Sequence, residues 1–347
     1  MEERWTARTL ATWDAGFALP PLGLWLDPRR RVELGFASDP FGAGLAKRVI
    51  ATPETVRFLR RRRRKAMPTF LPSPLGRSFL LGKAELRLLP AGPLPGAAQL
   101  EVKLRGGTLL YLRRILLEPV GLGGVPEAPR ADAVLVDAPG TVAPQACARR
   151  ADTVAAIRAW VERAQQNGEI PVLLVEPYTA GPALAAHLGR AGYELRMHSA
   201  IYESVRLCAA AGTAFERAWP LGSAPRIDQV VLLPWSAAAG EGADAAAPGV
   251  LAKLRESVPA GEASPRLRVA VVHDGSSPLP AELRPDEVFL LAFTAGVPEI
   301  VSHVQRTGAG EVLLSPDTPV VIGNVLRELG VARVERLGPP EQLGLHA

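Results

Sequence analysis

The sequence predicts a globular α/β protein built in two parts, and three observations support this prediction. The length of 347 residues suits two domains or one large two-part domain. Residues 1–145 have the pattern of many strands with few helices, whereas strands and helices alternate from Asp152 onward. Alternation of that kind indicates a parallel sheet built from β-α-β units.

The first part contains several apolar segments of strand length. A helix follows one of them, with Pro53 in its first turn and Glu54 beside it, where the helix dipole favours an anion. The Gly106-Gly107 pair predicts a hairpin. The expected strands are Gly16–Asp27 (a strand pair around a Pro turn), Val32–Ser38, Val49–Ala51, Ser78–Leu89, Gln99–Leu112 and Ala133–Asp137.

The second part begins with a helix whose apolar residues recur at helical spacing from Val154 to Ala164 and which ends at Asn167-Gly168. Residues 236–265 are rich in Ala and Gly and predict a loop with a helix at Val250–Val258. The other expected strands are Pro171–Glu176, Tyr193–Met197, Gln229–Leu233, Arg268–His273, Val288–Phe293, Glu311–Leu314 and Val331–Leu337, and the other expected helices are Pro182–Arg190, Ser199–Ala211, Pro298–Thr307 and Val320–Leu329.

Composition narrows the class of protein. Hydrophobic residues make up 48% and charged residues 22%, so the chain can bury a sizeable core. Residues 1–10 lack the apolar segment of a secretory signal, and no uncharged apolar run is long enough to cross a membrane. Cys147 and Cys208 lack metal-ligand spacing and are expected to be reduced thiols. We therefore expect a cytoplasmic protein without membrane association.

Charge is unevenly distributed along the chain. The formal net charge is +5, but residues 1–150 hold 24 of the 40 Lys and Arg residues and 13 of the 35 Asp and Glu residues. A basic first part suits contact with a polyanion such as DNA or RNA. It equally suits attraction between the two parts of the chain.

Several short segments together resemble one known family. They are GFALPPLGLWLDP, VIATPET, LLPAGPLPGAAQLEV, LLEP, DAVLVDAPG, MHSAIYESVRLCAAAG and TGAGEVLL. In this order they resemble the β-CASP branch of the metallo-β-lactamase superfamily, and within it the bacterial ligase-associated DNA exonucleases. The resemblance implies an αββα sandwich formed by residues 1–145 and 286–347, with a parallel α/β domain inserted at 146–285.

The resemblance also implies a two-metal site, and this chain departs from it. The family's metal-ligand positions fall on Asp39, Phe41, Ala43, Gly44, Pro93, Arg114 and Thr294. Only Asp39 among them offers a group that binds a divalent ion. In the family, one acid orients a metal-bound His without binding the metal itself, and its position matches Asp27. The first acid and the first catalytic His of the inserted domain match Asp137 and His198. The chain is therefore expected to have no metal cofactor, with the family's Zn or Mn site lost.

Arg114 stands where the resemblance places the carboxylate that bridges two metals. Two like unit charges 4 Å apart repel by about 4 kcal/mol at an effective dielectric constant of 20, so a cation here opposes a metal. We expect Arg113 or Arg114 to replace the lost ions and pair with Asp27, Asp39 or Asp137, because an unpaired buried charge is costly.

The surviving residues also have ordinary structural interpretations. Asp27 precedes Pro28 and suits a turn at a strand end. Asp137 suits a turn in the same way, and His198 suits the first turn of a helix as a capping or packed residue.

Six consecutive cations form the remaining functional candidate. They are Arg60, Arg61, Arg62, Arg63, Arg64 and Lys65, near the expected C-terminal end of a helix. One interpretation is a solvated helix end favoured by the dipole. The other is contact with nucleic-acid phosphates. Such binding would not depend on nucleotide sequence, because no aromatic residues lie between the cations to stack on bases.

The sequence therefore predicts a catalytically inactive pseudonuclease that binds nucleic acid or a DNA-processing partner, namely a ligase, a helicase or an intact nuclease paralogue. The alternative is an active exonuclease or hydrolase of the same fold, with a rebuilt single-metal site or with His198 and Asp137 acting without metal. A third interpretation is a purely structural subunit.

Overall fold

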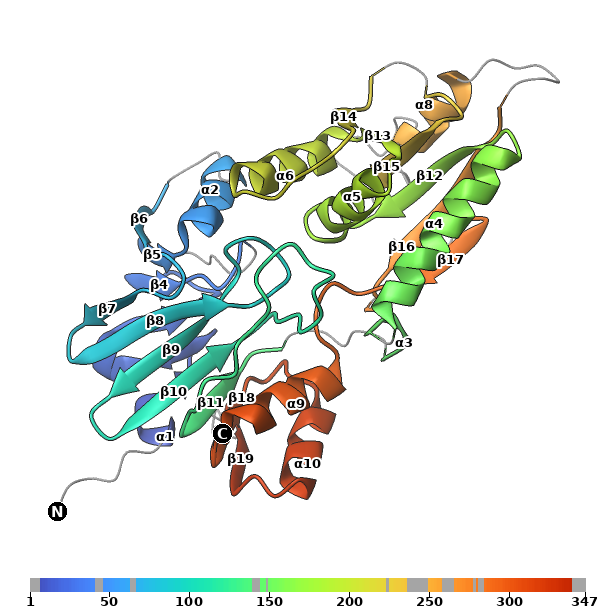
Figure 1. Cartoon of the computed structure of the whole chain (residues 1–347). Helices are drawn as coiled ribbons and strands as arrows, with labels where there is room; N and C mark the ends of the chain where they lie inside the picture. The colour runs from blue at the N-terminus through green and yellow to red at the C-terminus, as the bar shows by residue number, and fades with distance from the viewer. Residues whose placement is uncertain are drawn as a thin grey trace, which may run out of the picture. The chain divides into compact units, whose positions relative to one another are not determined.

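The computed structural model describes residues 7–40, 46–62, 67–138, 144–147, 149–222, 225–235, 249–257, 265–276, 279 and 284–338. The chain forms two compact units (Figure 1). The first comprises Met1–Pro119, Gly123–Thr141 and Thr294–Ala347, and the second comprises Val120–Leu122 and Val142–Phe293. Both units are of mixed α/β class.

The first unit contains two sheets. Sheet 1 has the strand order β1 (Thr12–Trp13), β2 (Phe17–Leu19), β3 (Leu24–Leu26), β4 (Leu34–Phe36), β5 (Arg48–Ala51) and β6 (Thr69–Pro72). Sheet 2 has the order β19 (Arg333–Arg336), β18 (Glu311–Leu314), β11 (Ala133–Val136), β10 (Gly107–Leu112), β9 (Ala98–Leu104), β8 (Ala84–Pro90) and β7 (Ser78–Leu81). Strands β3 to β6 run parallel, as do β10, β11, β18 and β19.

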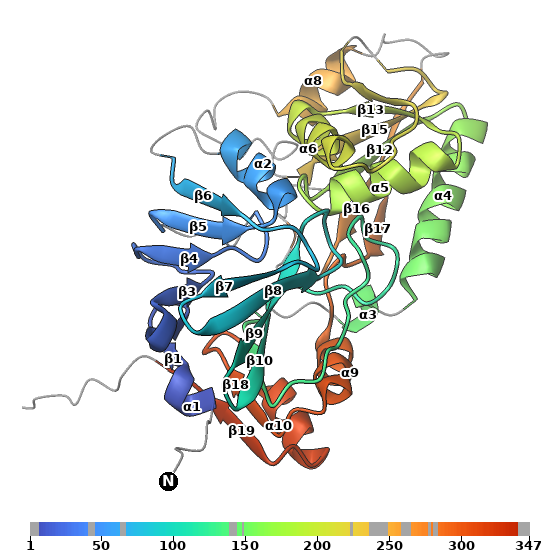
Figure 2. The ribbon, with the colours of Figure 1, turned by 60° about the vertical axis from the view of Figure 1, so that its left-hand side comes forward.

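The two sheets pack face to face over one apolar core (Figures 1 and 2). Phe17 and Phe36 of sheet 1 each meet the ring of Tyr111 of sheet 2 edge-on, with centroids 6.1 and 6.2 Å apart. Because side chains alternate between the faces of a strand, each sheet presents its other residues to an outer layer. The core of this unit is therefore a two-sheet sandwich.

Helices cover the outer faces of both sheets. On sheet 1, α2 (Pro53–Arg62) buries Val56 and Leu59 in a second apolar cluster with Val49 of β5. On sheet 2, His303 of α9 (Val297–Thr307) bonds Gln99 of β9, and α10 (Val320–Glu328) packs on β19. The short helices α1 (Ala7–Leu10) and η1 (Pro20–Leu22) complete the described helices of this unit.

The second unit has one parallel sheet, here sheet 3. Its order is β14 (Ala218–Pro220), β13 (Glu194–Met197), β15 (Gln229–Pro234), β12 (Ile170–Val175), β16 (Leu267–His273) and β17 (Glu287–Leu290). Among the described residues its helices are α3 (Pro144–Cys147), α4 (Arg150–Gln166), α5 (Ala180–Arg190), α6 (Ser199–Ala210) and α8 (Val250–Ser257). The alternation of strands and helices predicted from Asp152 onward is confirmed.

Some elements differ from the expectation in ways that packing explains. The strand expected at Val288–Phe293 is β17, which pairs with β16, so the second unit extends beyond the expected boundary at residue 285. Strand β6 was not expected, because prolines bracket its short apolar segment. It lies at the edge of sheet 1, where a proline costs no ladder hydrogen bond.

No helix among the described residues is both long and apolar enough for a membrane span.

Candidate functional site

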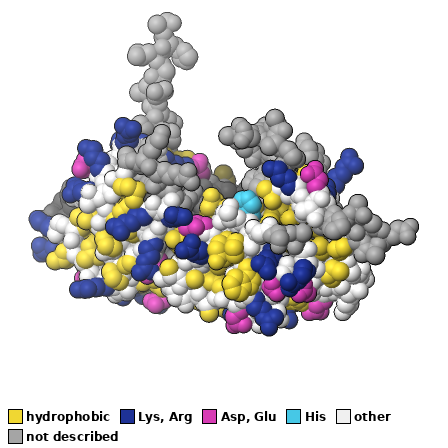
Figure 3. Space-filling view, turned by 90° about the horizontal axis from the view of Figure 1, so that it is seen from above, with side chains coloured by type: hydrophobic (Ala, Val, Ile, Leu, Met, Phe, Trp, Pro, Cys, Tyr) yellow, Lys and Arg dark blue, Asp and Glu magenta, His cyan; other side chains and the backbone are white. Residues whose placement is uncertain are grey.

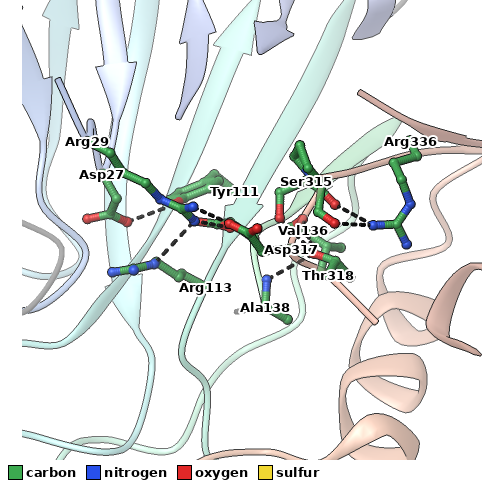
Figure 4. A network of polar contacts seen from close by, with 12 residues as sticks. Asp27, Arg29, Tyr111, Arg113, Val136, Ala138, Ser315, Asp317, Thr318 and Arg336 are labelled. Carbon is green, nitrogen blue, oxygen red and sulfur yellow. Dashed lines mark hydrogen bonds and ion pairs between the residues drawn. The ribbon is translucent and has the colours of Figure 1, made fainter. Parts of the chain in front are cut away.

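Charged side chains gather where parallel strands of the first unit end. Parallel strands direct their carboxyl ends to one edge of a sheet, where ligand sites of α/β proteins commonly lie. Asp27 follows β3 and Asp39 lies shortly after β4, while Arg113 follows β10 and Asp137 follows β11. We call Asp27, Asp39, Asp137, Arg29, Arg113 and Arg114 the carboxylate–arginine cluster (part of it is shown in Figure 4).

Asp27 is the most constrained member. It is buried and takes a left-handed backbone conformation with φ of 45°, which Asp tolerates better than most residues. One carboxylate oxygen accepts a hydrogen bond from the Ser38 amide at 2.9 Å, and the other accepts one from the Tyr111 hydroxyl at 2.8 Å. Asp27 thereby links β3 to the segment after β4 and to sheet 2.

The environment of Asp27 changes its acidity. Burial raises its pKa to about 6, against the opposing positive charge of Arg113 and with a further increase from the neighbouring charge of Asp39. Burial likewise raises the pKa of Tyr111, so the phenol stays a hydrogen-bond donor to Asp27. A carboxyl group in this setting changes protonation at a higher pH than an ordinary Asp.

Asp137 is paired with two arginines. Arg113 Nε lies 3.2 Å from one carboxylate oxygen, and an Arg29 nitrogen donates to the other at 3.3 Å. Arg29 also pairs with Asp317, which follows β18, and its guanidinium lies 5.4 Å from the ring centroid of Trp13. These contacts tie the turn after β3 to the carboxyl ends of β11 and β18 (Figure 4).

Arg113 is the buried cation of the cluster, with its side chain 10% exposed. Burial by itself would lower its pKa, but the charges of Asp27, Asp39 and Asp137 outweigh that effect and raise it. Its Nε and Nη1 atoms make no hydrogen bond within the residues that the structure describes. The guanidinium is therefore held by charge and packing more than by directed hydrogen bonds.

Asp39 is paired with the other arginine. Its buried carboxylate lies 3.7 Å from Arg114, whose side chain is 34% exposed. The predicted pairing of Arg113 or Arg114 with one of the three acids is therefore present for both arginines. Each arginine brings its charge to a different carboxylate, so Asp137 and Asp39 are each balanced by a guanidinium group of the protein itself.

The other positions where the resemblance implies metal ligands hold no His, Cys, Asp or Glu. Pro93 is buried in the loop between β8 and β9, and Thr294 begins the last segment of the first unit. Phe41, Ala43 and Gly44 lie outside the described residues, and residues 41–45 contain no His, Cys, Asp or Glu. No three His, Cys, Asp or Glu side chains within the described ranges gather as metal ligands. These residues do not fit a two-metal centre.

His198 lies in the second unit, at the start of α6. Its Nδ1 accepts a hydrogen bond from the Ala200 amide at 3.2 Å, so the ring acts as an N-terminal cap. Partial burial lowers its pKa, which favours the neutral form of the ring that can accept that bond. This geometry matches the structural interpretation of His198.

The run of cations is described only in part. Helix α2 includes Arg60, Arg61 and Arg62, and the side chains of Arg60 and Arg61 are exposed. The Arg60 guanidinium lies 5.6 Å from the ring centroid of Phe70 on β6. Arg63, Arg64 and Lys65 fall outside the described residues.

Sequence reasoning missed two members of the site. Tyr111 has the pattern of an ordinary inward-facing strand residue. The only sign of a role in the site is that it lies on β10, two residues before Arg113. Arg29 stands in a basic turn, and no local pattern indicates a partner as distant in sequence as Asp317, 288 residues away.

Comparison with known proteins gives no family assignment: no protein-family model matches the chain, and no curated protein matches it either.

Proposed function

We propose that this chain is a catalytically inactive protein of metallo-β-lactamase/β-CASP type, a pseudonuclease that binds nucleic acid through its phosphates. The observation that carries the proposal is the pairing of Arg113 with Asp137 and of Arg114 with Asp39. Both pairs lie at the strand ends where the family resemblance implies metal ligands and their supporting acids.

Electrostatics supports the absence of two-metal chemistry. Two-metal hydrolysis needs a pair of ions about 3.5–4 Å apart that clamp the attacking and leaving oxygens. In this cluster the charge of two buried acids is already balanced by guanidinium groups. Asp27 is engaged by the Ser38 amide and the Tyr111 hydroxyl, which leaves it no role as a free general base.

The arrangement of the first unit supports the family part of the proposal. Two sheets pack face to face with helices on both outer faces, and a separate unit with a parallel sheet interrupts this sandwich in sequence. The resemblance implies the same succession of layers and the same inserted domain. Fold-level likeness alone does not assign chemistry, whereas the side chains of the carboxylate–arginine cluster limit which chemistry is possible.

Charge supports nucleic acid as the ligand. Residues 1–150, most of which belong to the first unit, hold 24 of the 40 Lys and Arg residues. Figure 3 shows Lys and Arg side chains scattered over the face that it draws, with Asp and Glu side chains among them. Lys and Arg side chains bind phosphates by releasing counterions, and the binding weakens steeply as salt rises.

The test combines metal analysis, hydrolysis and binding on the purified full chain. We expect no stoichiometric metal, no cleavage of single-stranded or duplex DNA or RNA with added Mn²⁺ or Zn²⁺, and salt-dependent binding of the same oligonucleotides. Cleavage that Arg114→Gln leaves intact but Asp137→Asn abolishes would favour the active hydrolase. If the chain binds no nucleic acid and a ligase, helicase or nuclease co-purifies with it, the proposed ligand would be that protein and not nucleic acid.

A further inference from the structure

We infer that the outward face of helix α2 is a phosphate-binding surface that prefers double-stranded over single-stranded nucleic acid. The inference rests on the proposed function and adds the surface and the class of ligand. Its residues are Arg57, Arg60 and Arg61, and we call this set the α2 arginine face.

The three arginines share one side of a rigid helix. Their spacing of three and four residues places them side by side along α2. All three are exposed, whereas Phe58 and Leu59 between them are buried in the first unit. Burial of the opposite side fixes the helix, so the cations are displayed by a packed element and not by a loop.

The charge of α2 is one-sided. Glu54 in the first turn is its only acidic residue, and the arginines follow it toward the C-terminal end. The helix dipole stabilises cations at that end of a helix. Four residues rise about 6 Å along a helix axis, so Arg57 and Arg61 can reach successive phosphates of one strand.

In the described part of the first unit, no exposed ring lies beside the α2 arginine face to stack on a base. The Arg60 guanidinium lies over the Phe70 ring at 5.6 Å, which orients the arginine and covers that face of the ring. No Phe, Trp or Tyr of the first unit is exposed among the residues that the structure describes. Recognition at this surface is therefore electrostatic, without the base stacking that favours single strands.

An electrostatic surface favours the ligand with the denser charge. Duplex DNA carries one charge per about 1.7 Å of its axis, whereas each strand by itself carries one per about 3.4 Å. Each neutralised phosphate also releases more counterion from a duplex, with a salt slope of about 0.9 per contact against about 0.7 for a single strand. The α2 arginine face should therefore bind duplex more tightly.

The experiment measures fluorescence anisotropy of labelled DNA of about 20 base pairs, and of its single strand, across a salt series. The test variant is Arg57→Gln/Arg60→Gln/Arg61→Gln in the full chain. The matched control is Arg77→Gln/Arg105→Gln/Arg333→Gln, three exposed arginines of the same unit that make the same change in net charge. Circular dichroism and thermal unfolding check that both variants fold.

We expect the wild type to bind duplex more tightly than single strand, and the test variant to reduce the slope of log affinity against log salt by up to about 2.7. The control should leave the slope nearly unchanged. Phe70→Leu should weaken binding about two- to five-fold and leave most of the slope, because it removes only the stacking partner of Arg60.

Four results would overturn the inference. Equal or tighter binding of the single strand removes the duplex preference. An unchanged slope in the test variant places the phosphate contacts elsewhere and leaves the proposed function standing. If poly-glutamate displaces the labelled DNA at a lower charge concentration than unlabelled duplex does, the ligand is an acidic protein. If the wild type binds neither oligonucleotide, the proposed function is wrong as well.

Discussion

The Tyr111 hydroxyl donates a 2.8 Å hydrogen bond to Asp27, and both residues are buried in the first unit. The bond joins a strand of sheet 2 to the turn that follows β3 of sheet 1. It places a carboxylate whose pKa is raised to about 6 beside the Arg113 guanidinium. The stability of the first unit should therefore depend on this contact and on the charge of Asp27.

Tyr111→Phe should destabilise the first unit by about 1–3 kcal/mol, because it leaves a buried carboxylate oxygen without its donor. Urea unfolding followed by fluorescence measures the change. Tyr193→Phe is the matched control, because the exposed Tyr193 hydroxyl donates to Glu162 at 2.7 Å and its loss should cost much less. Equal losses in the two variants would contradict a special role for the Tyr111 bond.

Because of Asp27, the free energy of unfolding should fall as pH rises. Its folded pKa of about 6 lies above the unfolded value of about 3.9, so the folded state binds the proton more tightly. The free energy of unfolding should decrease between about pH 4 and about pH 6, by roughly 3 kcal/mol in total from this group.

Asp27→Asn should remove that dependence while keeping the left-handed backbone, which Asn also tolerates. The readout is the difference in unfolding free energy between wild type and variant across pH. Asp14→Asn is a control of opposite sign, because pairing with Arg30 lowers the pKa of Asp14. If the difference in unfolding free energy between the wild type and Asp27→Asn stays constant with pH, the pKa of Asp27 is not raised.

Arg113→Met should be among the most destabilising changes in the cluster, by about 3–5 kcal/mol, since it leaves buried acids without their buried cation. Arg114→Met should cost far less, because its side chain is 34% exposed. Thermal unfolding of both variants ranks them. A double-mutant cycle with Asp137→Asn should show coupling for Arg113, and its absence would mean that the 3.2 Å pair contributes no net stability.

Gly92, next to Pro93 in the loop between β8 and β9, should not tolerate a side chain. Its φ is +105°, and a Cβ there would lie 2.3 Å from the Leu116 carbonyl oxygen. Gly82→Ala is the control, because Gly82 has a φ of +61° but open space around it. We expect Gly82→Ala to cost about 1 kcal/mol and Gly92→Ala several-fold more. Similar melting temperatures for the two would argue against the clash.

Sequence patterns predicted the fold better than the site. Apolar runs such as Pro171–Glu176 and helical spacing such as Val154 to Ala164 are local signals, and they correspond to β12 and α4. Strand β6 escaped prediction because its four residues end in proline and gain their place only by pairing with β5. Local propensity cannot register a contact of that kind.

At the site, the acids at strand ends and the arginines after β10 were visible in the sequence, because strand ends bring such residues to one edge. Tyr111 and Arg29 were not. The role of Tyr111 depends on the facing sheet, and that of Arg29 depends on Asp137 and Asp317 from distant strands. The left-handed conformation of Asp27 likewise follows from packing around the turn.

An anomalous difference map from crystals of the full chain soaked in Mn²⁺ shows whether the carboxylate–arginine cluster binds a metal. We expect no anomalous peak there, with Arg113 beside Asp137 and Arg114 beside Asp39. Manganese bound by Asp39 or Asp137, with either arginine displaced from its acid, would contradict it.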